Sequence, residues 1–225
     1  MHYVYVVHGD SFAHLCGRSQ DTVRKHDPSA VFTVYTDKTY GLEGETVIDS
    51  YHDKPFMLMN VICQAHWLSQ REATGEPVAF LDADAFMVQP LPDLGSGWDV
   101  GVTWRDNLGD LSMLQPYNYG VVFARRTVVA QAAWWWMCNH IAHQNPKNQD
   151  WYANQVALRE LCGPPQEDVS VRGHDCFDVT VKHLPCFTWN YTPDTEEDVS
   201  DKIFVHCKGN RKDLLNHYYH EIMAA

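Results

Sequence analysis

The chain has 225 residues, 45% of them hydrophobic and 20% charged, which is enough for one sizeable core and short for two, so a single domain over residues 1–225 is expected. Its formal net charge of −12 disfavours binding to nucleic acid or anionic membranes unless basic residues gather on one face. The seven cysteines include no closely spaced pair, which argues against a zinc ribbon or a disulfide scaffold and predicts reduced, mostly buried thiols.

In the first half of the chain, strand and helix patterns alternate. Short β-rich apolar runs predict strands at residues 3–7, 31–35, 46–48 and 78–81. A helix is expected over residues 11–25. A stronger helix is expected over residues 58–68, because its apolar residues recur at i, i+3, i+4 and i+7. Gly75 is suited to the segment in which the chain leaves this helix.

Strands separated by helices of this length predict right-handed crossovers and a doubly wound parallel sheet with helices on both faces. In such sheets, ligands bind at the carboxyl ends of the strands. The candidates for function are therefore the residues that directly follow strands, at positions 8–10, 36–37 and 82–84.

The second half of the chain is more mixed. Strand patterns occupy residues 98–104, 121–124, 177–187 and 203–205, and the third of these suits an antiparallel or edge strand. Helices are expected over residues 127–143 and 151–161. Polar loops join these elements, but no linker divides the chain into two domains.

Two aspartates directly follow the apolar run that ends at Leu81. In an extended segment, side chains two residues apart point to the same side, so Asp82 and Asp84 can present two carboxylates to one cation. The alternative is an ordinary solvated pair of acids. Their position after a core strand favours the metal site, because unpaired charges there are costly without a cation or hydrogen-bond donors.

A basic segment follows the last predicted strand. His206 offers a nitrogen ligand, Gly209 allows the backbone to approach a phosphate closely, and Lys208 and Lys212 can neutralise phosphate charge. This combination suits a metal-diphosphate site. The alternative is an ordinary basic turn in which His206 is a hydrogen-bonded residue at the end of a strand.

A third motif precedes the predicted strand at residues 121–124. Asn118 can hold a sugar hydroxyl, and Gly120 permits close contact with the backbone. On its own the motif is weak, because Asn-x-Gly mostly marks a turn.

Together, these motifs resemble those of the small retaining GT-A-fold glycosyltransferases, the family 8-like enzymes typified by glycogenin and bacterial galactosyltransferases. Four segments match in order: Asp82-x-Asp84, Asn118-x-Gly120, residues 148–151 at the start of a helix, and His206-x-x-Gly209-x-x-Lys212. The resemblance covers most of the chain, from about residue 3 to residue 212. It implies an α/β GT-A fold with a single doubly wound mixed sheet flanked by helices.

The resemblance also implies two adjoining binding sites. Asp82, Asp84 and His206 would bind Mn²⁺ or Mg²⁺. The residues implied in binding the UDP-sugar donor are Asp10 and Asp37 for uracil and ribose, Asp82 near the ribose, Lys54, Asp106, Asn118 and Gly120 at the sugar, and Lys208, Gly209 and Lys212 at the diphosphate.

The sequence departs from the family pattern in two places. The family has an acidic residue followed by Gln at the start of a helix, whereas this chain has Asn148-Gln149-Asp150, so either Gln149 or Asp150 would lie beneath the anomeric carbon as the catalytic-face residue. The usual Pro-Trp after the last lysine is replaced by Asp213-Leu214, which weakens any prediction about that loop.

The predicted activity is metal-dependent transfer of a hexose from a UDP-sugar to an acceptor hydroxyl, with retention. When the nucleoside diphosphate leaves, negative charge builds on the β-phosphate, and a divalent ion with a nearby lysine stabilises that charge. The acceptor is open: a saccharide, a protein or a modified nucleobase. The sequence does not determine the oligomeric state.

Two other functions stay open. A sugar-nucleotide nucleotidyltransferase shares the fold class, but residues 8–11 are a poor version of the glycine-rich basic loop that it needs after the first strand. A non-catalytic nucleotide-sugar-binding module is the other. The N-terminus lacks the basic start and long apolar run of a secretory signal, and no run of about 18 apolar residues occurs, so a cytoplasmic protein without membrane contact is expected.

Overall fold

The computed structural model spans residues 1–225 and describes all of them except 52, 107–115, 150–151 and 167. The candidate residue Asp150 therefore lies outside the described residues. In the described part of the chain, no helix combines the length and the apolar character needed to cross a membrane. All seven cysteines are free thiols and all but Cys176 are buried, as the sequence predicts.

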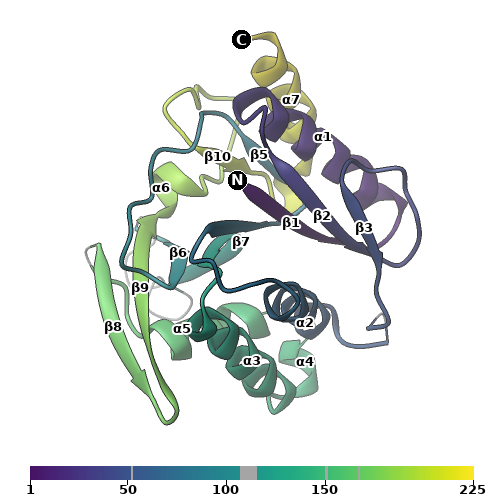
Figure 1. The fold of residues 1–225 in the computed structure, drawn as a ribbon. Helices are drawn as coiled ribbons and strands as arrows, with labels where there is room; N and C mark the ends of the chain where they lie inside the picture. Colours follow the sequence, from purple (N-terminus) through teal and green to yellow (C-terminus); the bar gives the residue numbers. More distant parts are fainter. Residues whose placement is uncertain (52, 107–115, 150–151, 167) are drawn as a thin grey trace.

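The first half of the chain forms the parallel part of an eight-stranded sheet (Figure 1). Its strands are β1 (His2–Val7), β2 (Val31–Thr36), β3 (Glu45–Ile48) and β4 (Pro77–Leu81). They lie in the order β3-β2-β1-β4, and each neighbouring pair is parallel. Helix α1 (Asp10–His26) connects β1 to β2, and α2 (Phe56–Ser69) connects β3 to β4. The predicted elements of this half are confirmed, with ends shifted by at most two residues.

The second half extends the sheet with strands of both orientations. They are β6 (Val100–Trp104), β7 (Tyr117–Arg125), β8 (Val169–His174) and β9 (Phe177–Pro185). β7 is antiparallel to β4 and β6, β9 is parallel to β6, and β8 is antiparallel to β9, which completes the order β3-β2-β1-β4-β7-β6-β9-β8.

The mixed sheet that the family resemblance implies is therefore confirmed, whereas the expectation of a parallel sheet is wrong beyond β4. One reason is the length of the connections. Only residues 175–176 join β8 to β9, and a parallel pair needs a crossover of a dozen or more residues. β8 itself was not among the predicted strands.

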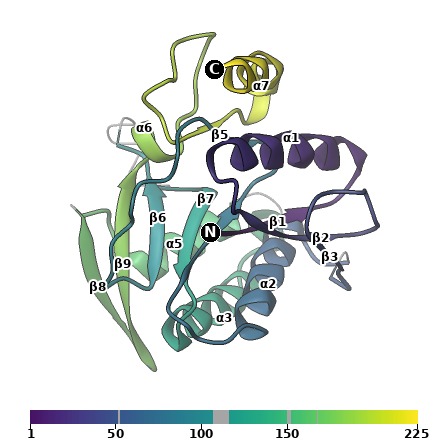
Figure 2. The same cartoon turned by 45° about the horizontal axis from the view of Figure 1, so that its top comes forward.

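Helices cover both faces of the sheet (Figures 1 and 2). α1 and the C-terminal helix α7 (Leu214–Ala224) lie on one side, and α2, α3 (Val128–Ala142) and α5 (Ala153–Cys162) lie on the other. The short helices are α4 (Pro146–Gln149) and α6 (Cys186–Trp189). α6 begins where the sequence predicts the end of a strand at residues 177–187, and α7 was not predicted.

The alternation of side chains along β1 explains why both faces are covered. Tyr3, Tyr5 and Val7 pack in the core that contains residues of α1, whereas Val4 and Val6 pack in the core formed with α2, α3 and α5. Because both sets are apolar, each face of the central strands is stable only when a helix covers it.

A separate two-stranded ribbon lies beside the main sheet. It consists of β5 (Ala85–Met87) and β10 (Phe204–His206), which run antiparallel with His206 opposite Ala85. A 3-10 helix, η2 (Gly209–Asp213), follows β10 and leads into α7. The single sheet that the resemblance implies is thus accompanied by this ribbon. The register of β10 against β5 places His206 next to Ala85, the residue that follows Asp84.

Candidate active site

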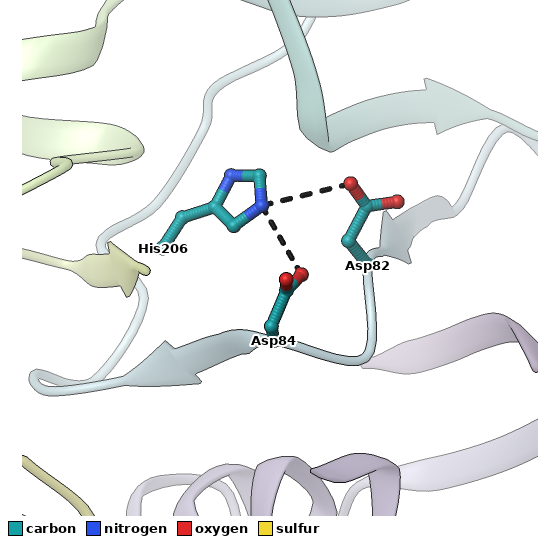
Figure 3. Close-up of side chains that lie close together, drawn as sticks. All are labelled: Asp82, Asp84 and His206. Carbon is teal, nitrogen blue, oxygen red and sulfur yellow. Dashed lines mark ion pairs between the residues drawn. The ribbon is translucent and has the colours of Figure 1, made fainter. Parts of the chain in front are cut away.

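Two carboxylates lie in the tight turn between β4 and β5. The backbone N–H of Asp82 donates to the Gly120 carbonyl at 2.9 Å, and the N–H of Ala85 donates to the Asp82 carbonyl at 3.1 Å. The segment from Asp82 to Asp84 is therefore a turn and not the extended strand that the sequence suggests. The two side chains nevertheless point toward the same imidazole (Figure 3).

That imidazole belongs to His206, which completes a cluster of three residues with Asp82 and Asp84, here called the metal-ligand cluster (Figure 3). Its Nε2 lies 3.2 Å from Asp84 Oδ1 and 3.7 Å from Asp82 Oδ2. One ligand atom from each residue lies within 4.8 Å of the others. Two carboxylates and one imidazole suit Mn²⁺ or Mg²⁺, because these ions accept oxygen-rich ligand sets that leave positions for phosphate oxygens.

A buried amide holds the His206 ring from behind. Asn190 donates from Nδ2 to Thr103 Oγ1 at 2.8 Å, so its Oδ1 faces His206 Nδ1 at 3.1 Å. An amide oxygen can only accept, and Nδ1 therefore carries the hydrogen while Nε2 faces the carboxylates. Outer partners of this kind orient a ligating histidine.

Gly120 leaves the space that the His206 ring occupies. A Cβ atom at this position would overlap three ring atoms of His206, so any larger residue would displace the imidazole. The sequence predicts a close approach of the backbone at Gly120. The structure shows that the nearest group is the His206 ring of the cluster.

The two carboxylates differ in their electrostatic surroundings. Burial raises the pKa of Asp82, against the opposing effect of His206. Burial also acts to raise the pKa of Asp84, but His206 and the Lys212 ammonium, whose Nζ lies 3.3 Å from Oδ2, hold it at about 2. The Asp84 side chain is only 10% exposed, so a bound divalent cation would stabilise the charged forms of both residues.

The cluster opens into a cleft of about 610 Å³, a volume typical of small-molecule sites. The cleft follows the edge of the sheet where β1, β4, β6 and β9 end and β7 begins. The predicted site residues that line it are Asp82, Asp84, Asn118, Gly120, His206, Lys208, Gly209 and Lys212.

Four other predicted donor contacts are exposed and do not line the cleft as the structure describes it. Asp10 forms an ion pair with Lys38 (2.8 Å), Asp37 accepts a hydrogen bond from the Tyr40 hydroxyl (2.8 Å), Lys54 pairs with Asp53 (3.3 Å), and Asp106 accepts from the Phe187 N–H (3.2 Å). Their roles at the nucleotide and the sugar stay predictions.

Gln149 also does not line the cleft. Its Nε2 donates to the carbonyls of Ala142 at 3.2 Å and Gln144 at 2.8 Å, at the end of α3. In this structure, Gln149 thus closes a helix end, and its role beneath the anomeric carbon stays a prediction. Asp150, the other candidate for the catalytic face, lies outside the described residues.

Two amides that the sequence analysis missed do line the cleft. Asn154 is buried in the first turn of α5, and Gln155 follows it. An amide followed by Gln near the start of a helix is the same pattern that identified Asn148-Gln149, and it recurs here six residues later. The signal was therefore present in the sequence, but the start of α5 at Ala153 was needed to see that this second pair also lies at a helix start.

Two further cations line the cleft. Lys208 is half-buried, and burial followed by the charge of Arg105 lowers its pKa to about 8. Arg105 is half-buried as well, and its Nη2 donates to Gln155 Oε1 at 2.8 Å. The sequence analysis did not select Arg105, because nothing local marks an arginine after a strand as part of a site.

Comparisons with known proteins identify the fold. No protein-family model matches the sequence, and no curated protein sequence matches it. The structure is similar to the galactosyltransferase LgtC in complex with donor and acceptor sugar analogues, with a TM-score of 0.61 and 14% identity over 100% of this chain and 95% of that chain. An active-site glutamine-to-glutamate mutant of LgtC matches equally well, with 13% identity and a TM-score of 0.61.

Two further structures have the same arrangement. A glycosyltransferase involved in the glycosylation of the major capsid of PBCV-1 has a TM-score of 0.62 and 13% identity over 98% of both chains. GlyE of Streptococcus pneumoniae TIGR4 has a TM-score of 0.62 and 12% identity over 100% of this chain and 60% of that chain. These identities show a common fold and do not transfer residue roles. The chain therefore has the GT-A fold of glycosyltransferases.

Proposed function

We propose that this protein transfers a hexose from a nucleotide diphosphate sugar, with UDP as the nucleotide, to an acceptor hydroxyl. The observation that carries the proposal is the convergence of Asp82, Asp84 and His206 in the same cleft as Lys212. A departing nucleoside diphosphate develops negative charge on its β-phosphate, and that charge needs positive groups fixed in advance. The GT-A fold supports the same class of reaction.

The donor atoms of the metal-ligand cluster fit Mn²⁺ or Mg²⁺, and Asp82, Asp84 and His206 would hold the ion. When bound, it would supply Lewis-acid stabilisation of the diphosphate oxygens. Lys212 would add a positive charge beside them, since its Nζ already lies 3.3 Å from Asp84 Oδ2. Gly209 has φ +61° and an uncrowded Cβ position, so its backbone can approach a phosphate closely.

The side-chain amides of Asn154 and Gln155 in α5 line the cleft and are suited to contact the transferred sugar. In a retaining reaction, the acceptor hydroxyl approaches from the side of the leaving group, and the departing phosphate oxygen takes its proton. An amide oxygen on the opposite face would stabilise the positive charge that develops at the anomeric carbon. We assign this role to Asn154 or Gln155, which line the cleft, with Gln149 or Asp150, the residues that the sequence predicts, as the alternatives, and Asn118 contacts a sugar hydroxyl.

The remaining parts of the proposal concern the two ends of the donor and the acceptor. Asp10 and Asp37 contact the uridine, and Lys54 and Asp106 contact the sugar when donor is bound. The acceptor is a saccharide, a protein or a modified nucleobase. A panel of nucleotides and nucleotide sugars with Mn²⁺ in a thermal-shift assay identifies the donor, because a ligand that binds only the folded state raises the apparent Tm.

The test of the activity is UDP release from UDP-glucose and UDP-galactose with and without Mn²⁺. Metal-stimulated release is expected for the unmodified protein, and Asp84→Asn should lower it at least ~100-fold because one ligand of the cluster is lost. The matched control is Asp175→Asn, in the exposed turn between β8 and β9, which should leave release unchanged.

Three results would contradict the proposal. Full activity in Asp84→Asn would remove the metal-ligand cluster from the reaction. Donor binding without turnover, across the panel of acceptors, would indicate a non-catalytic binding module. Formation of a nucleotide sugar from UTP and a sugar 1-phosphate would indicate a nucleotidyltransferase.

A further inference from the structure

Gln64, in the middle of α2, has a side-chain amide whose orientation is fixed by two aromatic residues. The Tyr119 hydroxyl donates to Gln64 Oε1 at 2.6 Å, and the Trp134 Nε1–H donates to the same oxygen at 2.9 Å. The three side chains are buried and come from α2, β7 and α3. Because an indole N–H can only donate, the atom that faces Trp134 must be the oxygen of the Gln64 amide.

The orientation of Gln64 in turn fixes that of Asn60, one helical turn earlier in α2. Gln64 Oε1 faces the two aromatic residues, so Nε2 is left to donate to Asn60 Oδ1, at 2.5 Å. The Asn60 amide therefore has Oδ1 toward the core and Nδ2 on its other side. We call Asn60, Gln64, Tyr119 and Trp134 the amide relay.

The relay ends at the cleft. Asn60 is only 4% exposed, and it is one of the residues that line the cleft. Its Oδ1 is engaged by Gln64, whereas Nδ2 has no hydrogen-bond partner among the residues that the structure describes. A donor that is nearly removed from water and lacks a partner is costly, so a ligand oxygen that accepts from Nδ2 would offset this cost.

The relay lies beside the metal-ligand cluster. Tyr119 directly precedes Gly120, whose carbonyl accepts from the N–H of Asp82 at 2.9 Å. Helix α2 also packs in the same core as α5, on one face of the sheet (Figure 1), and Asn154 and Gln155 of α5 line the same cleft as Asn60. On this side of the sheet, the two helices therefore contribute neutral amides to the cleft, next to the place proposed for the diphosphate.

The chemistry of the relay indicates which part of the donor Asn60 contacts. The groups that hold Asn60 are uncharged, whereas the charge of a diphosphate calls for cations such as Lys212 at the cluster. An amide N–H is well suited to a hydroxyl oxygen, and the hexose carries more free hydroxyls than the ribose. The hexose also directly follows the diphosphate, on the side where the reaction takes place.

We propose that Asn60 is a specificity-determining residue, which donates a hydrogen bond from Nδ2 to a hydroxyl oxygen of the transferred sugar. Gln64 is the positioning residue that holds Asn60 in this orientation. This inference rests on the proposed function and adds a sugar contact in α2 to it. A site of this kind discriminates against a sugar that lacks the hydroxyl, because the buried donor is then left without a partner.

The test measures Kd, in the presence of Mn²⁺, for UDP, UDP-glucose, UDP-galactose and the monodeoxy forms of both sugar nucleotides. In the unmodified protein, at least one monodeoxy form should bind ~10–100-fold more weakly than its parent, the scale expected when a buried donor loses its partner. In Asn60→Ala, the difference between that form and its parent should disappear, and Kd for UDP should stay unchanged.

Two further comparisons test the orientation of the amide. A deoxyfluoro form has a fluorine that accepts a hydrogen bond weakly and cannot donate one, so its Kd should lie between those of the parent and the deoxy form. Gln64→Met keeps a side chain of similar length but loses the donor to Asn60, and it should reduce the discrimination with Kd for UDP unchanged.

Gln20→Ala is the matched control for these variants. Gln20 is a buried amide in α1 that lies outside the cleft, where it bonds to the backbone carbonyl and N–H of Glu43 at 2.9 and 3.1 Å. Its replacement should leave every ratio of Kd values unchanged. A thermal melt of each variant without ligand shows whether it is folded.

The outcomes separate this inference from the proposed function. If UDP with Mn²⁺ does not bind at all, the proposed function fails and this inference fails with it. If UDP binds but every monodeoxy form binds as its parent does, or if the discrimination survives in Asn60→Ala, only the role of Asn60 is overturned. Equal weakening of UDP and of the sugar nucleotides in Asn60→Ala also overturns it, because the contact would then lie at the nucleotide.

Discussion

The metal-ligand cluster and the acids predicted to bind the uridine differ in burial and in position. In the cluster, Asp84 is buried in the cleft and pairs with His206 at 3.2 Å and with Lys212 at 3.3 Å. Asp10 and Asp37 are exposed and do not line the cleft as the structure describes it, and Asp10 pairs with Lys38 at 2.8 Å. The packing around the cluster therefore orders its side chains before any ligand arrives, whereas the two exposed acids lie at the protein surface.

The largest expected effect tests how far the cluster depends on its packing. Gly120→Ala should abolish metal-stimulated UDP release, with a loss of at least ~100-fold, because the new Cβ overlaps the His206 ring. Overpacking should also lower the free energy of unfolding by ~1–3 kcal/mol. UDP release and urea denaturation measure the two effects.

Gly17→Ala is the control for this substitution. A Cβ at Gly17, within α1, would meet only Leu42 Cδ2 at 3.6 Å. This change should leave UDP release intact and stabilise the helix by up to ~1 kcal/mol. Normal turnover in Gly120→Ala would show that the position of His206 is not needed.

The next effect tests the support behind the cluster. Asn190→Ala removes the acceptor of the His206 Nδ1–H and should weaken Mn²⁺ binding ~10–100-fold, the usual effect of losing an outer partner of a ligand. The shift of Tm with Mn²⁺ concentration measures it. Asn139→Ala, on the exposed face of α3, is the control, and an unchanged Mn²⁺ dependence in Asn190→Ala would contradict the prediction.

The smallest effect concerns β9, the strand that ends beside the cleft. His183 in β9 is buried between Ser170 and Tyr117, and burial, followed by the charge of Arg172, lowers its pKa to about 4. Protonation thus favours the unfolded chain, in which the pKa is ~6.5. The stability that the neutral ring supports is present above pH ~6.5 and is lost as the pH falls toward 4.

Between pH 7.5 and 5.5, His183 should therefore account for a decrease of ~1 kcal/mol in the free energy of unfolding. Urea denaturation at the two pH values measures it. The decrease should be smaller by this amount in His183→Gln and unchanged in His14→Gln, where the histidine is exposed on α1. Equal pH dependence in all three proteins would contradict the assignment to His183.

Local patterns in the sequence were enough to predict the strands and helices of the first half of the chain. The apolar runs of β1, β2 and β4 and the helical periodicity of α2 depend on neighbours in the chain, so they can be predicted without the rest of the molecule. β5 was missed because only the turn at residues 82–84 separates it from β4, and α6 was missed because its residues continue the strand pattern of β9. β8 was missed because its alternate side chains are exposed, as at Val169 and Val171.

The sequence by itself identified Asp82, Asp84 and His206, because each follows a strand and carries a ligand type that a divalent cation prefers. Only the tertiary structure decided how they meet: β10 pairs with β5 so that His206 lies opposite Ala85. The same holds for Arg105, Asn154 and Asn190, whose roles depend on neighbours far away in the chain. Strand order and register arise from packing of the whole core, and no local pattern of residues records them.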